Sequence, residues 1–395
     1  MSRAKLNKEL KKSLFYLCLI APFYEPAFFD DCLPIVDAFF LGGKVLVLLY
    51  LFYRVTKGQK LSAMFFAFFV LQFYLLIVTI AYSGSIAVVA MQVFNVAAIC
   101  LIVEKGISEN FIAFLKALYF YFGILLVTSL ITAIIAPNGL YFLADEFSQT
   151  GNSVNSIRFF LGHKNSVILT LLPGFLACAL LSYRLSDVKY RNLTWIYIIL
   201  MTILAIVLDA MNSLFLCIFL AAAYLLARTE KIQRLRSPFL FVPAIVIDLL
   251  ITNNEIRNWF AGLLSGIGRD ATLSGRERIW NAAIENISST PIFGQGIGDT
   301  ATELSRFAGF YSAHNMYFSI LAYGGIVGLL LLLSCYMIAL KSVSGTKAPS
   351  STLLKLVIIA LMLFGIFETM GIGCSVVALP LALAFAIGTK EKALR

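Results

Sequence analysis

Two histidines are the strongest candidates for acid–base chemistry in this chain of 395 residues. His163 and His314 are its only histidines, and each stands at the start of a long apolar segment. A neutral imidazole accepts a proton near neutral pH, which suits a general base. Ser312 has the side chain of a helix N-cap, which would place His314 in the first turn, where the helix dipole disfavours the imidazolium form. His314 is therefore a candidate general base, and a packed histidine bonded to a loop carbonyl is the alternative.

Arg276 is a candidate for binding an anion such as phosphate. Ser274 and Glu277 have the spacing of a capping box, so we expect a helix to begin here with Arg276 in its first turn. A guanidinium and the free backbone N–H groups of a first turn can bind phosphate oxygens together. Arg278 shares this turn, and contact of both arginines with lipid headgroups is the alternative. We expect the helix to lie on the membrane interface, because its apolar residues recur at helical spacing: Ile279, Trp280, Ala283, Ile284 and Ile287.

A second polar group precedes another apolar segment. Arg158, His163, Lys164 and Asn165 follow one another closely there. Basic groups at the mouth of a helix can bind an anionic substrate, and the alternative is that they anchor the helix end at the membrane interface.

The composition indicates a membrane protein. The chain is 60% hydrophobic and only 13% charged, whereas soluble domains carry about 25% charged residues. A net charge of +10 would suggest a nucleic-acid partner in a soluble protein. Here most basic residues stand in short segments between apolar runs, so we expect no nucleic acid and assign the charge to the membrane surface.

About twelve membrane-spanning helices are expected, each a run of mostly apolar residues. The segments are 13–28, 38–53, 61–81, 85–103, 111–136, 165–183, 193–208, 211–227, 238–252, 313–340, 354–369 and 372–388. Most Lys and Arg residues fall in alternate connecting segments, which predicts cytoplasmic N- and C-termini. The basic residues 1–12 precede an apolar run without a small-residue cleavage site, so we expect a retained first helix.

We therefore expect an all-α integral membrane protein, folded as a single polytopic domain over residues 1–395. Two long segments, 137–165 and 253–312, should face outward and form the active-site face. Both contain apolar and aromatic residues, so we expect short helices in them rather than disorder. In residues 291–298, glycines alternate, which lets the backbone approach another group closely.

The sequence does not predict a metal or another cofactor. The seven cysteines are widely spaced, without a metal-ligand or redox pair. Cys32 and Cys374 map to outer loops, where a disulfide is one alternative. Asp30 and Asp31 could be metal ligands, although a solvated acidic loop is the simpler interpretation.

These motifs together resemble the O-antigen polymerase and ligase superfamily. The residues that carry the resemblance are Gly275-Arg276 with Trp280, Pro291-x-Phe293-Gly294-x-Gly296-x-Gly298, and His314-Asn315 followed by Tyr323-Gly324-Gly325-x-x-Gly328. Gly162-His163-Lys164-Asn165 is similar to a His-Pro-Asn signature of that family, with Lys164 in place of proline. Many members carry a Ser-Arg pair where the eighth span begins, and here Met211-Asn212-Ser213-Leu214 lacks the arginine.

The resemblance implies a metal-independent, inverting glycosyltransferase of the GT-C type. Its donor would be a glycan on undecaprenyl pyrophosphate, and its acceptor a second lipid-linked glycan. His314 would be the base, Arg276 and Arg158 would bind the pyrophosphate, and Arg278 would be a further candidate. The other residues expected to bind substrate are His163, Asn165 and Asn315.

Within this family we favour a polymerase of capsule or exopolysaccharide repeat units at the outer face of the bacterial cytoplasmic membrane. A flippase and a chain-length regulator would be its partners. A ligase that transfers finished glycan to another acceptor is the first alternative. A lipid-linked oligosaccharide transporter is the second, but few charged residues lie inside the predicted spans, for example Lys44, Lys116 and Asp248.

Overall fold

The computed structural model describes residues 3–147, 153–234, 276–370 and 375–393, together with the single residues 242, 246 and 255. The predicted span at 238–252 lies almost wholly outside the described residues. Ser274, Gly275 and Cys374 also lie outside them, so the capping box and the disulfide stay untested.

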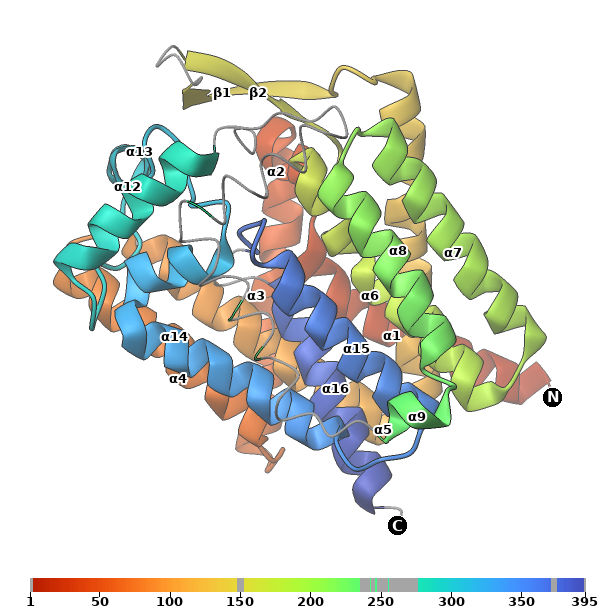
Figure 1. Ribbon diagram of the computed structural model, residues 1–395. Helices are drawn as coiled ribbons and strands as arrows, with labels where there is room; N and C mark the ends of the chain where they lie inside the picture. The colour runs from red at the N-terminus through yellow and green to blue at the C-terminus, as the bar shows by residue number, and fades with distance from the viewer. Residues whose placement is uncertain are drawn as a thin grey trace.

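Helices make up most of the described chain (Figure 1). In chain order they are α1 (Arg3–Ile20), the 3₁₀ helix η1 (Ala21–Tyr24), α2 (Ala27–Cys32), α3 (Pro34–Thr56), α4 (Ala63–Ala81), α5 (Ile86–Ile135), α6 (Lys164–Leu185), α7 (Val188–Val207), α8 (Met211–Leu226), α9 (Glu230–Gln233), α12 (Arg276–Ser289), α13 (Thr300–Arg306), α14 (Met316–Val343), α15 (Pro349–Phe364) and α16 (Ser375–Ala393).

The fold is that of a multi-pass membrane protein. Six described helices are long and apolar enough to cross a bilayer, namely α3, α4, α5, α6, α7 and α14. The long helix α5 joins two predicted spans, 85–103 and 111–136, across a kink at Asn110, whose side-chain oxygen accepts a hydrogen bond from Ala113 N at 3.0 Å. The total of twelve spans stays a prediction.

The first predicted span, residues 13–28, was wrong in its limits. The helix already begins at Arg3 and ends at Ile20, and Ala21–Tyr24 continues as a 3₁₀ turn. Lys, Glu and Leu are good helix formers, which explains why the charged N-terminal residues extend the helix.

The first outer segment contains a β-hairpin where short helices were expected. Strands β1 (Tyr141–Phe147) and β2 (Ser153–Arg158) pair antiparallel, with Tyr141 opposite Arg158. The hairpin lies at the same end of the bundle as α2, α12 and α13, while α9 and the C-terminus lie at the other end (Figure 1). The hairpin therefore places Arg158 at the same end of the molecule as the other candidate residues.

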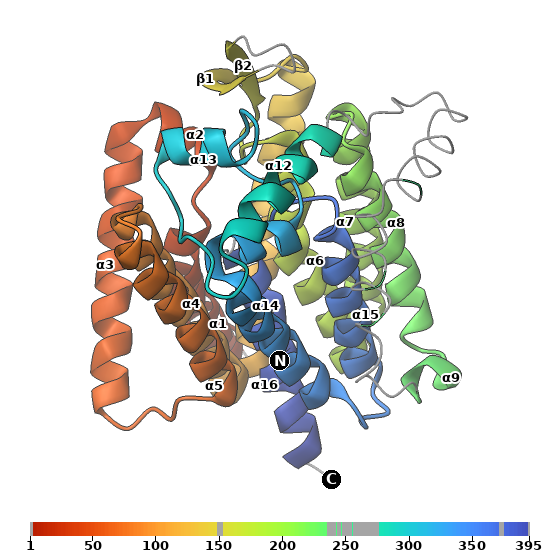
Figure 2. The same ribbon diagram turned by 60° about the vertical axis from the view of Figure 1, so that its left-hand side comes forward.

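Helix α6 is the central element of the bundle. Of its apolar window, 83% is buried, against 11% for the peripheral helix α3. It packs on α5, α7, α8, α15 and α16, and Figure 2 shows it beside α7 and α15. The polar residues at its first turn are therefore held in a fixed place at one end of the molecule.

Helix α14 is broken at Gly325, and the glycine-rich segment 291–298 fills the break. Gly325 has φ +60°, so the helix cannot continue its own hydrogen bonds there. Ile326 N donates to Pro291 O at 2.9 Å, and Gly296 N donates to Tyr323 O at 2.8 Å. In an apolar environment, broken helical backbone is tolerated only where other groups satisfy it. The segment therefore pairs with the protein's own backbone, which explains its glycines without a ligand.

We predict that Gly296→Ala destabilises the protein more than Gly345→Ala does. Both glycines have positive φ, +67° and +77°, and this alone should cost about 1–2 kcal/mol for alanine. A Cβ on Gly296 would also lie 2.5 Å from Thr79 Cα, whereas a Cβ on Gly345 meets nothing within 4 Å. The crowding should add about 1–3 kcal/mol. Thermal unfolding in detergent measures the difference, and equal losses for the two variants would contradict the packing described here.

Candidate functional site

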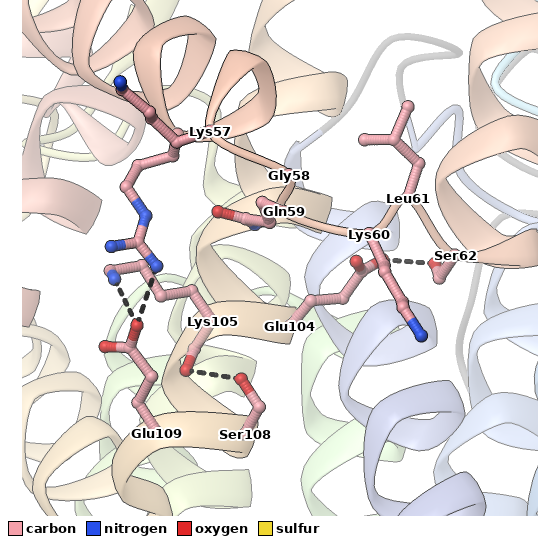
Figure 3. Close-up of a pocket in the computed structure, with 11 residues that line it drawn as sticks. Lys57, Gly58, Gln59, Lys60, Leu61, Ser62, Glu104, Lys105, Ser108 and Glu109 are labelled. Carbon is pink, nitrogen blue, oxygen red and sulfur yellow. Dashed lines mark hydrogen bonds and ion pairs between the residues drawn. The ribbon is translucent and has the colours of Figure 1, made fainter.

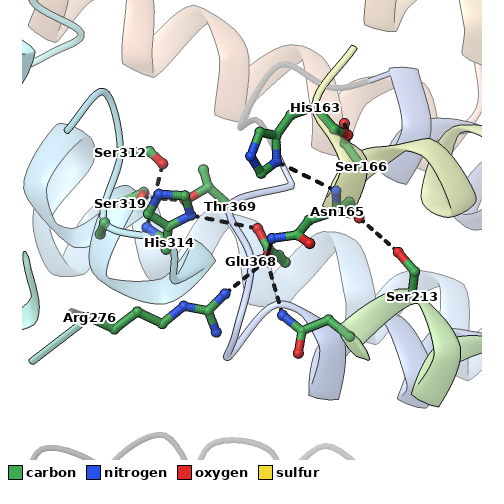
Figure 4. A network of polar contacts seen from close by, with 12 residues as sticks. His163, Asn165, Ser166, Ser213, Arg276, Ser312, His314, Ser319, Glu368 and Thr369 are labelled. Carbon is green, nitrogen blue, oxygen red and sulfur yellow. Dashed lines mark hydrogen bonds and ion pairs between the residues drawn. The ribbon is translucent and has the colours of Figure 1, made fainter. Parts of the chain in front are cut away.

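Polar side chains from several elements converge on the carboxylate of Glu368 (Figure 4). Its Oε1 accepts hydrogen bonds from Asn165 Nδ2 at 2.7 Å, Asn212 Nδ2 at 3.0 Å and an Arg276 guanidinium nitrogen at 3.0 Å. The Glu368 and Arg276 side chains are only 10% and 15% exposed. The cluster therefore contains a nearly buried ion pair with additional amide donors.

His314 lies on the other oxygen of the same carboxylate. Its Nδ1 is 3.7 Å from Glu368 Oε2, which is too long for a strong hydrogen bond but close enough for an electrostatic interaction. The His314 backbone has φ +46°, a left-handed conformation that histidine adopts more often than most residues. The predicted base and the predicted phosphate-binding residue Arg276 thus share one carboxylate.

Backbone contacts between α14 and α15 hold Glu368 beside His314. Glu368 follows the end of α15, where its N–H donates to Phe364 O at 3.1 Å. Met316 N, at the start of α14, donates to Gly365 O at 2.7 Å, and the Tyr317 hydroxyl donates to Met362 O at 2.9 Å. These bonds join the first turn of α14 to the end of α15 and the residue that follows it.

Helix α12 is fixed to the same unit, and its expected position on the membrane interface stays a prediction. Ile279, Trp280 and Ala283 are buried, and α12 packs on α14. The indole of Trp280 donates to Ala313 O at 3.0 Å, directly beside His314. The apolar face of α12 therefore covers protein, and Arg276 at its first position points to Glu368.

The predicted N-cap of α14 was wrong. Asn315, not Ser312, caps the helix: its side-chain oxygen accepts from Tyr317 N at 2.8 Å and Phe318 N at 3.0 Å. His314 therefore precedes the helix and does not lie in its first turn. Asn315 is fully buried, so it positions His314 and offers little surface to a substrate.

His163 and Asn165 approach the cluster from the start of α6. His163 is the N-cap of α6, and its Nδ1 accepts from Asn165 N at 3.5 Å. Burial, with the positive charges of Arg158 and Lys164, lowers the pKa of His163 to about 4, although Glu368 opposes this shift. His163 is therefore neutral near pH 7.

The two remaining arginines lie at different places. Arg158, at the end of β2, is half-buried and close enough to His163 for its charge to affect that imidazole. Arg278 is exposed, donates to Ala308 O at 3.0 Å and lies 5.7 Å above the Phe310 ring. Arg158 is therefore at the edge of the cluster, and Arg278 is engaged by the loop before His314.

Residues 152–333 match the family model described as O-antigen ligase. This match supports the resemblance of the chain to the O-antigen polymerase and ligase superfamily. No curated protein matches the chain. The family suggests a glycosyltransferase-like enzyme that acts on lipid-linked glycans at the bilayer. The matched stretch contains His163, Arg276 and His314, which the structure places around Glu368, while Glu368 itself lies beyond it.

Glu368 and Asn212 were missed by the sequence interpretation. Burial opposes ionisation of Glu368, but the contacts with His314 and Arg276 outweigh it and lower its pKa. The sequence contains one indication for each residue. Glu368 is an acidic residue within the predicted apolar span 354–369. Asn212 stands where many members of the family that the chain resembles carry Ser-Arg. At the start of α8, the side-chain amide of Asn212 therefore supplies a neutral hydrogen-bond donor to Glu368 in place of that arginine.

A separate cavity of about 460 Å³ lies at the other end of the molecule (Figure 3). The loop from α3 to α4 and the kinked part of α5 line it. Arg54 and Lys105 both bind Glu109 there, at 3.1 and 2.6 Å. None of the site residues that the sequence predicts lines this cavity.

Possible metal ligands do not gather in the part of the chain that the structure describes. That part contains no group of three or more His, Cys, Asp or Glu residues placed to hold a metal ion. Asp31, an alternative ligand, instead accepts a hydrogen bond from the Tyr141 hydroxyl at 2.6 Å. Independence from metal stays a prediction.

The half-buried, neutral His163 makes the stability of the protein sensitive to acid. Its pKa is about 4 in the folded chain against an ordinary 6.5, so the unfolded chain binds more protons between these values. We predict that stability is fully present above about pH 6.5 and is lost as the pH falls toward 4. Thermal unfolding at pH 7 and pH 5 should show a smaller loss for His163→Gln, which does not titrate. An equal loss in both proteins would place the acid-sensitive group elsewhere.

Proposed function

We propose that this protein polymerises oligosaccharide repeat units linked to undecaprenyl pyrophosphate into surface polysaccharide, on the outer face of the bacterial cytoplasmic membrane. One observation carries the proposal: Arg276 and His314 lie on the two oxygens of the same buried carboxylate. A phosphate-binding group and a base within one cluster are what transfer from a pyrophosphate donor requires.

The reaction is a single inverting displacement. The oxygen of an acceptor hydroxyl bonds to the anomeric carbon of the donor sugar, and the bond from that carbon to the pyrophosphate oxygen breaks. The pyrophosphate leaves with the electron pair, and His314 Nε2 takes the proton of the hydroxyl. His314 Nδ1 faces Glu368, which leaves Nε2 for the acceptor.

Arg276 and Arg158 stabilise the leaving group. Negative charge increases on the pyrophosphate as the glycosidic bond breaks, and preorganised cations offset it most strongly where water is scarce. The Arg276 side chain is 15% exposed, and Arg158 stands beside His163 on the hairpin. We assign Asn165 and His163 to the donor side of the site, and Arg278 to the support of the loop before His314.

The arrangement of charges along the chain supports an outward-facing site. The candidate residues all lie on segments that the distribution of Lys and Arg assigns to the outside, with both termini in the cytoplasm. Undecaprenyl-linked donors reach such a site within the membrane surface. A flippase that delivers the donor and a chain-length regulator are the partners that this reaction implies.

The resemblance of Gly162-His163-Lys164-Asn165 to capsule and exopolysaccharide polymerases favours polymerase over ligase. A ligase requires a chemically different acceptor, whereas a polymerase uses a second copy of its donor. Supplying only one lipid-linked repeat unit therefore distinguishes the two activities. A lipid-linked oligosaccharide transporter would form no glycosidic bond.

We predict that the purified protein forms a ladder of polymer from one lipid-linked repeat unit in excess chelator. His314→Ala should lower the rate by about 10²–10⁴-fold, the usual contribution of a positioned base, because the acceptor hydroxyl would lose its proton acceptor. His163→Ala should be milder, since His163 only shapes the donor side. Gel electrophoresis of the products measures both effects.

Different results would redirect the proposal. Product only after addition of a second type of acceptor would identify a ligase, and loss of product in chelator, restored by Mg²⁺, would identify a metal-dependent enzyme. Normal polymer from His314→Ala together with none from His163→Ala would show that the roles of the two histidines are reversed.

We predict that Arg276→Lys is strongly impaired although it keeps the positive charge. Lysine lacks the planar fork that binds two oxygens at once, so both the donor affinity and the rate should fall by about tenfold or more. Arg276→Ala should be nearly inactive at a normal protein level, as judged from kcat and KM for the donor. Full activity of Arg276→Ala would show that Arg276 does not bind the pyrophosphate and only contacts lipid headgroups.

A further inference from the structure

Glu368 faces two groups that carry a positive charge at different stages of the reaction. In the structure without substrate its Oε1 binds Arg276 at 3.0 Å, and its Oε2 lies 3.7 Å from His314 Nδ1. Arg276 is always charged, whereas His314 gains a charge only when it accepts the proton of the acceptor. One carboxylate thus serves a permanent cation and a transient one.

Donor binding must change this pairing. A pyrophosphate bound by Arg276 competes with Glu368 Oε1 for the guanidinium, one nitrogen of which now donates to that oxygen at 3.0 Å. A carboxylate with only 10% of its side chain exposed is costly to leave without a cation. His314, whose Nδ1 lies 3.7 Å from Glu368 Oε2, can supply one once it becomes an imidazolium.

We infer that Glu368 is a positioning residue that exchanges partners during turnover: it neutralises Arg276 while the site is empty, and it holds His314 once the donor has taken Arg276. The inference rests on the proposed function and adds a coupling between donor binding and the strength of the base. His314 becomes a better proton acceptor only when a pyrophosphate occupies the site, because only then is the charge of Glu368 released from Arg276.

The other groups around Glu368 do not replace this pairing. Asn165 and Asn212 donate to Oε1 from α6 and α8 but are neutral. His163, beside Asn165, is kept neutral by burial and by nearby positive charge. Arg158 and Lys164 act electrostatically on His163, and Lys164 Nζ lies 3.9 Å from an Asp209 carboxylate oxygen.

The partner exchange predicts opposite changes in binding and in rate for Glu368→Gln. The amide no longer competes for Arg276, so farnesyl pyrophosphate, a short prenyl pyrophosphate, should bind about tenfold more tightly. The same amide cannot stabilise an imidazolium, so polymer formation should be slower by about 10²-fold or more. The acid side of the rate profile should also move down by about one pH unit. Calorimetric titration in detergent and the polymer assay measure these effects.

A matched control separates this role from a general effect of losing a buried carboxylate. Glu303 is 6% exposed and pairs with Arg306 at 2.9 Å, away from the cluster. Glu303→Gln should lower thermal stability without tightening farnesyl pyrophosphate binding or moving the pH profile. Glu368→Asp, with a shorter side chain that keeps the charge, should change binding and rate in the same directions as Glu368→Gln, but less.

The outcomes distinguish the inference from the proposed function. Unchanged or weaker binding of farnesyl pyrophosphate to both Glu368 variants overturns the inference, even if His314→Ala is inactive. Loss of that binding in Arg276→Ala shows that the probe occupies this site. Failure of the unaltered protein to form polymer from the lipid-linked repeat unit overturns the proposed function itself, whatever the affinity for farnesyl pyrophosphate.

Discussion

A carboxylate that is largely removed from water has to be paired, and this constraint acts on Glu368. Its partners come from four separate parts of the chain: the starts of α6, α8 and α12, and the segment before α14. Each partner lies at an element's end, where backbone direction and side-chain direction are both fixed by capping and packing. A displacement of any one of these ends would leave a buried polar group without its partner. The requirement to pair one charge therefore determines how these four elements meet.

The backbone around the break in α14 follows the same rule. Segment 291–298 satisfies the N–H and C=O groups that Gly325 releases, and a second buried ion pair holds the segment in place. Arg306 donates to Gly296 O at 2.9 Å, and Glu303 accepts from Gly298 N at 2.6 Å. Since α12 leads directly into this segment, the segment fixes the C-terminal end of α12. The glycine-rich motif thus contributes to the site through packing, at a distance from the chemistry.

The sequence draws attention to residues whose types are rare or chemically distinctive, and the structure brings three of them together. His163 and His314 are the only histidines, and Arg276 stands in a local helix-start pattern, so composition and spacing single them out. The N-cap of α14 was harder, because Ser312 and Asn315 are both good caps and only tertiary contacts of the first turn decide between them. Glu368 could not be placed from sequence, since its partner Arg276 is 92 residues away. The hairpin was missed because its strands have only seven and six residues. An alternating pattern of this length is too short to identify a strand between long apolar helices.

The shared carboxylate also determines how reactive the empty site is. With Arg276 paired and His163 neutral, the charges at the centre of the cluster cancel, while Arg158 and Lys164 add positive charge beside His163. If the acceptor binds first, Glu368 is still neutralised by Arg276. Its charge then does little to stabilise the imidazolium that would form on His314. A donor that arrives first separates Arg276 from Glu368 and makes the same base stronger. A single charge is shared between binding and proton transfer, so this carboxylate links the two steps directly.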